Sequence, residues 1–216
     1  MRDNWKVNYC EMPEEINLEN KIEDFWNWFV LNEGEFYDIN ENNRDGKLDL
    51  ILEKLSVIQS GLAVELSEEF NNKRELVISA DGDREIFSMV EKIVTKAPKV
   101  NNWIITPFRQ RIQEDFSIEY GGILMTPSRM FFSPLIDEGF LDLIIYAEDI
   151  SGFDEDEILY IGLLVIDGVL GEYDCVTKVR YYDFHELNKV KEKSDLVPLA
   201  NLPKFVDEFY QRKNGP

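Results

Sequence analysis

The chain has 216 residues, of which 44% are hydrophobic and 12% aromatic, a composition that favours a folded globular protein over a disordered one. Its 43 acidic and 23 basic residues give a net charge of −20, which repels phosphate backbones and anionic lipid head groups. This charge argues against nucleic acid and membrane surfaces as partners and leaves a basic protein surface or a cation, although acidic surfaces also serve solubility alone.

The first predicted elements are two helices. Apolar side chains recur at helical spacing between residues 22 and 30, which predicts an amphipathic helix from about residue 19 with Phe25, Trp26 and Phe29 in the core. Trp28 lies off this apolar face and is expected to meet a second helix or a partner. The second helix is predicted from about residue 47 to 59, so the chain should begin with a helical hairpin.

The remaining elements follow from alternating segments, turn residues and apolar runs. In chain order they are a β-hairpin within residues 61–80, a helix at 84–97, four strands of an antiparallel meander within 101–149, a helix at 154–172, a strand at 175–184, a mobile loop at 185–200 and a helix at 202–212.

This order predicts an α+β protein with an antiparallel-rich sheet packed against helices, plus the N-terminal helical hairpin. The series from residue 74 to 184 suggests a ferredoxin-like βαββαβ sheet with two inserted strands. No linker divides the chain, so we expect a single domain over residues 1–216, with residues 1–18 lying over its surface.

Four stretches together resemble a family of uncharacterised bacterial proteins. They are FWNWF at 25–29, RELVISADGDRE at 74–85, DFSIEYGGI at 115–123 and FSPL at 132–135. The resemblance implies a bacterial, intracellular α+β protein, and it carries neither an activity nor any site residues.

Residues 41–52 approximate the calcium loop of an EF-hand, because oxygen-bearing side chains, a glycine and an apolar residue occupy the expected positions. The twelfth position, which should be a bidentate glutamate, is Leu52, and Glu53 comes one place too late. A polar turn that begins the second helix explains the pattern equally well. We therefore predict no metal site and no cofactor.

Three arginines mark the candidate binding site. Arg109 and Arg111 would share one face of the predicted sheet, and a neighbouring strand could place Glu119 opposite them, with Tyr120 and Arg129 nearby. Such a face could grip a carboxylate or phosphate in forked geometry. Cross-strand ion pairing is the simpler interpretation of the same residues.

Nucleophilic catalysis has little support in the sequence. His185 is the single histidine and is expected to be exposed, so a catalytic pair would have to combine it with Cys175 or with an unmarked serine. The two cysteines, Cys10 and Cys175, have neither disulfide-framework nor zinc-site spacing. Glu119 and Asp167 could be buried carboxylates, but the sequence names no partner for them.

These observations favour a non-enzymatic cytoplasmic protein whose acidic surface binds another protein, such as an immunity-like neutraliser of a basic toxin or nuclease. The N-terminus lacks the apolar stretch of a secretory signal, and the apolar run at 158–170 is too short to span a bilayer. The alternative is a metal-assisted hydrolase that uses clustered carboxylates.

Overall fold

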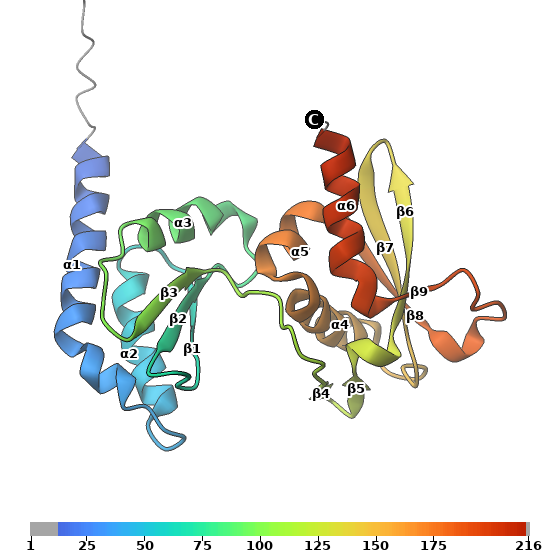
Figure 1. Ribbon diagram of the computed structural model, residues 1–216, viewed down its shortest axis with the longest axis horizontal. Helices are drawn as coiled ribbons and strands as arrows, with labels where there is room; N and C mark the ends of the chain where they lie inside the picture. Colours follow the sequence, from blue (N-terminus) through green and yellow to red (C-terminus); the bar gives the residue numbers. More distant parts are fainter. Residues whose placement is uncertain (1–12, 215–216) are drawn as a thin grey trace, which may run out of the picture. The chain divides into compact units, whose positions relative to one another are not determined.

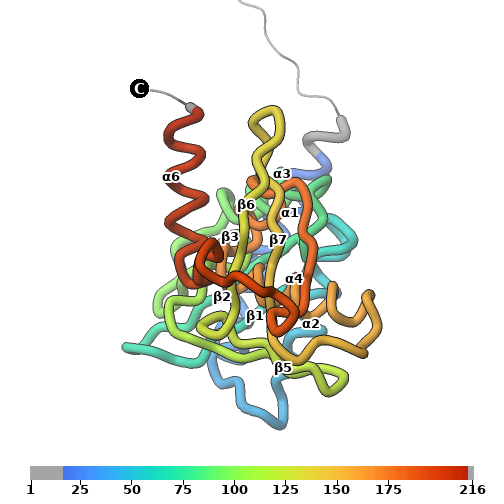
Figure 2. Tube along the Cα trace, turned by 90° about the vertical axis from the view of Figure 1, so that its right-hand side faces the viewer, coloured from blue at the N-terminus to red at the C-terminus, as the bar shows by residue number. Residues whose placement is uncertain are grey.

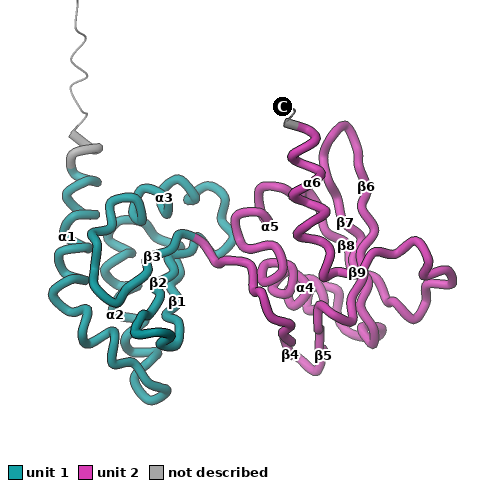
Figure 3. Tube along the Cα trace, in the orientation of Figure 1, with its two compact units in different colours: residues 1–107 teal, residues 108–216 magenta. Residues whose placement is uncertain are grey.

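The computed structural model describes residues 13–214, in which helices and mostly antiparallel strands form an α+β structure (Figure 1). The predicted fold class is thereby confirmed. Residue contacts divide the chain into two compact units, residues 1–107 (unit 1) and residues 108–216 (unit 2) (Figure 3). The single domain expected from the sequence stays a prediction, because it depends on whether the two units unfold together in one cooperative transition.

Unit 1 combines helices with a three-stranded sheet of order β1-β2-β3. Its elements are α1 (Pro13–Tyr37), α2 (Arg44–Ser56), β1 (Ala63–Leu66), β2 (Arg74–Ser79), η1 (Arg84–Ile86), α3 (Phe87–Thr95) and β3 (Trp103–Pro107). β1 and β2 form the predicted antiparallel hairpin, whereas β3 lies parallel to β2. Parallel neighbours need a long crossover connection, and α3 supplies it.

The core of unit 1 is aromatic. Phe25, Trp26 and Phe29 are at most 3% exposed, as their helical spacing predicts. The indole N–H of Trp26 donates a 2.9 Å hydrogen bond to the carbonyl of Ile93 in α3. Phe29 meets Trp103 of β3 edge to face, with ring centres 5.1 Å apart. The apolar face of α1 therefore joins a helix and a strand that lie far along the chain.

The predicted helical hairpin is formed by α1 and α2. α1 begins at Pro13, within the segment 1–18 that was expected to lie over the surface, and the earlier residues of that segment lie outside the described range. Trp28 reaches the second helix, where the ammonium of Lys54 lies 5.6 Å from its ring centre. This contact confirms the prediction that Trp28 meets a second helix.

Unit 2 combines a two-stranded sheet, β4-β5, with a four-stranded sheet of order β8-β7-β6-β9. Its elements are β4 (Ile118–Tyr120), β5 (Ile123–Met125), η2 (Pro127–Arg129), β6 (Phe131–Asp137), β7 (Phe140–Ala147), α4 (Glu155–Leu170), α5 (Glu172–Lys178), β8 (Tyr181–Glu186), η3 (Leu187–Lys189), β9 (Val197–Pro198), η4 (Leu199–Asn201) and α6 (Leu202–Asn214). β6 and β7 run side by side as an antiparallel hairpin (Figure 2).

The core of unit 2 lies between the four-stranded sheet and the helices α4 and α6. Leu143 and Ile145 of β7 are buried in one cluster with Ile161 and Val165 of α4. β8 lies parallel to β7, and α4 and α5 form the crossover between them. Residues 185–200, where the sequence predicts a mobile loop, contain the end of β8, η3 and β9.

α4 approaches β8 closely at Gly162. A Cβ atom on this glycine would lie 2.3 Å from the ring of Phe184, so a larger residue would force the ring or the strand to shift. Gly168, on the same helix, meets the ring of Phe116 in a similar way. Glycines inside an apolar helix predict such a close approach of strands. Gly162 does face a strand, whereas Gly168 faces the irregular segment before β4.

Three predicted details of the fold are wrong. The meander over residues 101–149 does not form one sheet, because β3 pairs with β2 while β4-β5 and β6-β7 are separate hairpins. The ferredoxin-like sheet is absent from the described residues for the same reason, since β2 and β3 lie in one sheet and β7 and β8 in another. The strand predicted from Cys175 begins only at Tyr181, after the short helix α5.

Within residues 13–214, no helix combines the length and the apolar character needed to cross a membrane.

Candidate functional site

The five residues of the predicted binding site lie in three different places in unit 2. Arg109 and Arg111 belong to the irregular segment before β4, Glu119 and Tyr120 belong to β4, and Arg129 ends η2. Each arginine is engaged by carboxylates of its own unit. Their capacity to bind a ligand stays a prediction, and the pairing described below differs from the cross-strand arrangement expected.

Arg109 is fixed by two acidic side chains from the crossover helices. Its Nε donates a 2.6 Å hydrogen bond to Asp167 of α4, and its main-chain N–H donates to the carboxylate of Glu172 at 3.1 Å. The main-chain N–H of Glu172 in turn donates to the Arg109 carbonyl at 2.9 Å. Glu172 is completely buried, so this exchange fastens the irregular segment to the start of α5.

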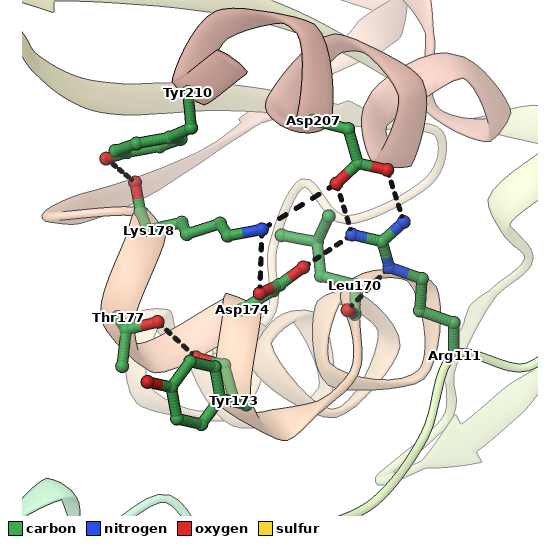
Figure 4. Close-up of polar contacts among 8 residues, drawn as sticks. All are labelled: Arg111, Leu170, Tyr173, Asp174, Thr177, Lys178, Asp207 and Tyr210. Carbon is green, nitrogen blue, oxygen red and sulfur yellow. Dashed lines mark hydrogen bonds and ion pairs between the residues drawn. The ribbon is translucent and has the colours of Figure 1, made fainter. Parts of the chain in front are cut away.

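Arg111 is the centre of a charged cluster that joins the same segment to α5 and α6 (Figure 4). Its guanidinium forms a forked pair with Asp207 at 2.8 Å for both bonds, and a 2.5 Å bond to Asp174. Lys178 pairs with Asp174 at 2.9 Å and lies 3.7 Å from Asp207. Two cations and two carboxylates therefore balance one another, and the cluster serves to hold α6 in place.

The Arg111 cluster should make stability depend on pH. The hydrogen bond from Arg111 lowers the pKa of Asp207 below its usual value, so Asp207 adds stability above the ordinary carboxyl pKa of about 4 and loses it as pH falls through its lower folded pKa. We therefore expect Asp207→Asn to lower the free energy of unfolding at pH 7. The difference from the wild type should shrink in acid. Asp207 is 40% exposed, so the effect should be no more than about 1 kcal/mol.

Urea melts at pH 3 to 7 measure this difference. Glu208→Gln, on the same helix and in surface pairs only, is the matched control and should change stability less. An Asp207→Asn loss that is equal at every pH would show that the pair does not titrate as described.

The remaining predicted site residues make local contacts. Glu119 is exposed and lies opposite Leu124 of β5. Tyr120 packs on Tyr160 of α4, with ring centres 5.2 Å apart. Arg129 pairs with Glu148 at 2.6 Å. Glu119 and Tyr120 are therefore neighbours on one strand, and the carboxylates that pair with the three arginines are other residues.

From its fourth position onward, the EF-hand-like stretch at residues 41–52 is helical. Arg44 begins α2, so Asp45 and Asp49 lie on a helix. The side chain of Asn43 accepts a 2.8 Å hydrogen bond from the main-chain N–H of Asn40, which closes a polar turn before the helix. Within residues 13–214, no group of three or more His, Cys, Asp or Glu side chains is arranged to hold a metal ion.

Cys175 and His185 have separate surroundings. Burial raises the pKa of the Cys175 thiol to about 11, and the Tyr182 hydroxyl lies 3.4 Å from its sulfur. A thiol with so high a pKa is a poor nucleophile at neutral pH. His185 is exposed, as predicted, and pairs with Asp183 at 2.8 Å. These contacts give neither residue the partner that acyl-transfer chemistry requires.

A groove of about 830 Å³ lies between the first half of α4 and the strand β8. On the helix side it is lined by Glu155, Asp156, Ile158, Leu159 and Leu163. On the strand side it is lined by residues 180–186 together with Lys189 and Val190 of the following segment. The strand side thus includes the basic side chains Arg180, His185 and Lys189, of which Arg180 pairs with Asp142 and His185 with Asp183. The helix side is acidic and apolar.

The acidic end of the groove is formed by the first turn of α4. Asp154 caps this helix by accepting a hydrogen bond from the main-chain N–H of Asp156 at 2.9 Å. Glu155, Asp156 and Glu157 follow, and within the described residues none of them has an ion-pair partner. The sequence predicts these acids at a helix start, where the helix dipole favours negative charge. Nothing in the sequence indicates that β8 lies beside them.

Comparisons with protein-family models, with curated proteins and with solved structures find no match to this chain.

Proposed function

We propose that this protein acts in the cytoplasm of a bacterium by binding a basic protein, without catalysing a reaction, in the manner of a neutraliser of a toxin or nuclease. The observation that carries the proposal is the acidic groove of unit 2, in a chain whose net charge is −20. Glu155 and Asp156 line this groove, and within the described residues neither forms an ion pair, although Lys189 lines the same groove.

Unpaired acids at the rim of a groove act mainly on the rate of association. A concentrated negative field steers a cationic partner toward the surface and repels anionic competitors. The arginine cluster illustrates the contrast, because its acids are balanced by Arg111 and Lys178 and project little charge into solvent. A recognition surface for a basic protein is therefore better matched by the groove than by the arginines.

Within the described residues, no particular contact favours the metal-assisted hydrolase. The carboxylates around the arginine segment, Asp167, Asp174 and Asp207, pair with Arg109, Arg111 and Lys178. Such pairing describes a structural role for these acids.

The test is to isolate the partner and measure how its association depends on salt. The tagged protein is captured from its own cells, the partner is purified, and the on-rate is followed by stopped-flow fluorescence. We expect a basic partner whose on-rate falls on the order of tenfold or more between low and physiological ionic strength. A partner without net positive charge, or a rate independent of salt, would contradict the proposal.

Two double variants locate the interaction. Glu155→Lys with Asp156→Lys should slow association and leave the protein folded, because each acid replaced in the first turn of α4 costs only about 0.3–1 kcal/mol. Glu23→Lys with Asp24→Lys makes the same change in net charge on exposed positions of α1 and is the matched control. Equal slowing by both pairs would show that total charge matters and that the groove does not.

A further inference from the structure

The two edges of the four-stranded sheet differ in how they are protected. One edge is formed by β9, which has only two residues and contains Pro198, two features that discourage pairing with another chain. The other edge is β8, which has six residues and no proline. Within the described residues β8 has a strand neighbour on one side only, so half of its main-chain hydrogen-bonding groups face outward.

The free edge of β8 opens on the groove beside α4. Along the helix, Glu155, Leu159 and Leu163 all line the groove and follow one another at intervals of four residues. Four residues of helix rise about 6 Å. Two residues of an extended strand advance about 6.6 Å, so alternate side chains of a strand beside β8 would meet these three helix residues in turn.

We propose that this groove receives an extended, positively charged segment of a partner protein, which adds to the free edge of β8 as a further strand. This inference rests on the function proposed above and specifies the form of the partner. Main-chain hydrogen bonds to β8 supply affinity, and side chains at alternate positions supply specificity. The inward-facing side chains should be one basic residue toward Glu155 and two apolar residues toward Leu159 and Leu163.

Charge selects this occupant over a second copy of the chain. Two copies that each carry −20 repel one another, and both would bring Glu155 and Asp156 to the same place. A cationic segment pairs with the same acids. Leu159 is 40% exposed, so an apolar side chain placed on it removes hydrophobic surface from water.

The proposal is tested with a randomised octapeptide library selected against the full-length protein, followed by synthesis of the best peptide. We expect selected peptides to contain one basic and two apolar residues at alternate positions. Leu159→Glu and Glu155→Lys should each weaken binding of the synthetic peptide at least tenfold by fluorescence anisotropy. Glu157→Lys, in the same helical turn but outside the groove lining, is the matched control and should change it less than threefold.

A scan of the peptide backbone separates strand addition from simple charge attraction. Methylation of successive peptide nitrogens removes one hydrogen-bond donor at a time. In an added strand, methylation should weaken binding at least tenfold at every second residue and have little effect at the residues between, because only alternate N–H groups face β8. Since the change is made in the peptide, the folding of the protein is not disturbed.

The outcomes distinguish the two proposals. Absence of selected peptides, or methylation effects without a two-residue period, would overturn strand addition. If the methylation effects lack a two-residue period but Glu155→Lys still weakens binding, the acidic binding function stands. The selected peptides could instead show the two-residue period, carry no positive charge and bind the Glu155→Lys variant equally well. That result would contradict both the charged occupant and the acidic function.

Discussion

Replacement of Trp26 by alanine is expected to lower the free energy of unfolding by about 3–5 kcal/mol, the largest effect of any single change considered for this protein. Trp26 is 3% exposed, and its indole donates a hydrogen bond to the Ile93 carbonyl in α3. The variant therefore leaves a cavity in an aromatic core and also removes the donor from a buried carbonyl. Such a loss is a large part of the total stability of an ordinary domain.

Urea unfolding followed by far-UV circular dichroism measures the change. Leu31→Ala, in the same helix, is the matched control, because Leu31 is 84% exposed and its removal should cost less than about 0.5 kcal/mol. A Trp26→Ala shift as small as that of the control would show that the indole is not packed between α1 and α3.

The second large effect is expected at Gly162, where alanine should destabilise the protein by about 1–3 kcal/mol. The added Cβ would lie 2.3 Å from the Phe184 ring, so the ring, α4 or β8 must shift. Gly34→Ala in α1 is the matched control, since no atom lies within 4 Å of its added Cβ. There the same substitution should stabilise the helix by about 1 kcal/mol, because alanine has the higher helix propensity.

A second change tests the cause. Phe184→Leu in the Gly162→Ala background makes room for the methyl group, so the two substitutions together should cost less than the sum of their separate effects. Strict additivity would mean that Gly162 and Phe184 do not press on each other. Because β8 is also the proposed docking edge, Gly162→Ala should weaken peptide binding along with stability.

Local sequence patterns predict which residues form helices and strands better than they predict which of these elements pair or pack together. The apolar stripe around Phe25 and Phe29 predicts α1 and its core residues, because a helical face follows from spacing alone. The segment beginning at Trp103 is a strand, as its apolar residues indicate, but its alternation says nothing about which strand it joins. It pairs in parallel with β2 across the α3 crossover and takes no part in the expected meander.

Two further errors have physical causes. Residues 175–178 contain β-branched side chains that favour a strand, yet Gly171 ends α4 and the acids Glu172 and Asp174 suit the start of a new helix. The prediction of four strands within residues 101–149 counts residues 115–125 as one of them. Gly121 and Gly122 both have positive φ, and they turn this stretch into the hairpin β4-β5. In both places turn and capping residues outweigh strand propensity.

The candidate sites depend on contacts that no short pattern encodes. The partners of Arg111 lie 63 and 96 residues further along the chain, on α5 and α6. The groove requires that Leu159 of α4 lie beside β8, which follows the helix only after a second helix. Composition predicts the acidic character of the surface, and only the fold shows which acids remain unpaired beside a strand edge.

The aromatic core of unit 1 also determines what spectroscopy can report. All four tryptophans of the sequence fall within residues 1–107, and residues 108–216 have none. Indole emission during denaturation is thus a local probe, whereas circular dichroism sums the helices of both units. Superimposable curves would indicate one cooperative transition, and displaced curves would indicate two. A melt recorded by tryptophan fluorescence is, for this protein, a measurement on unit 1.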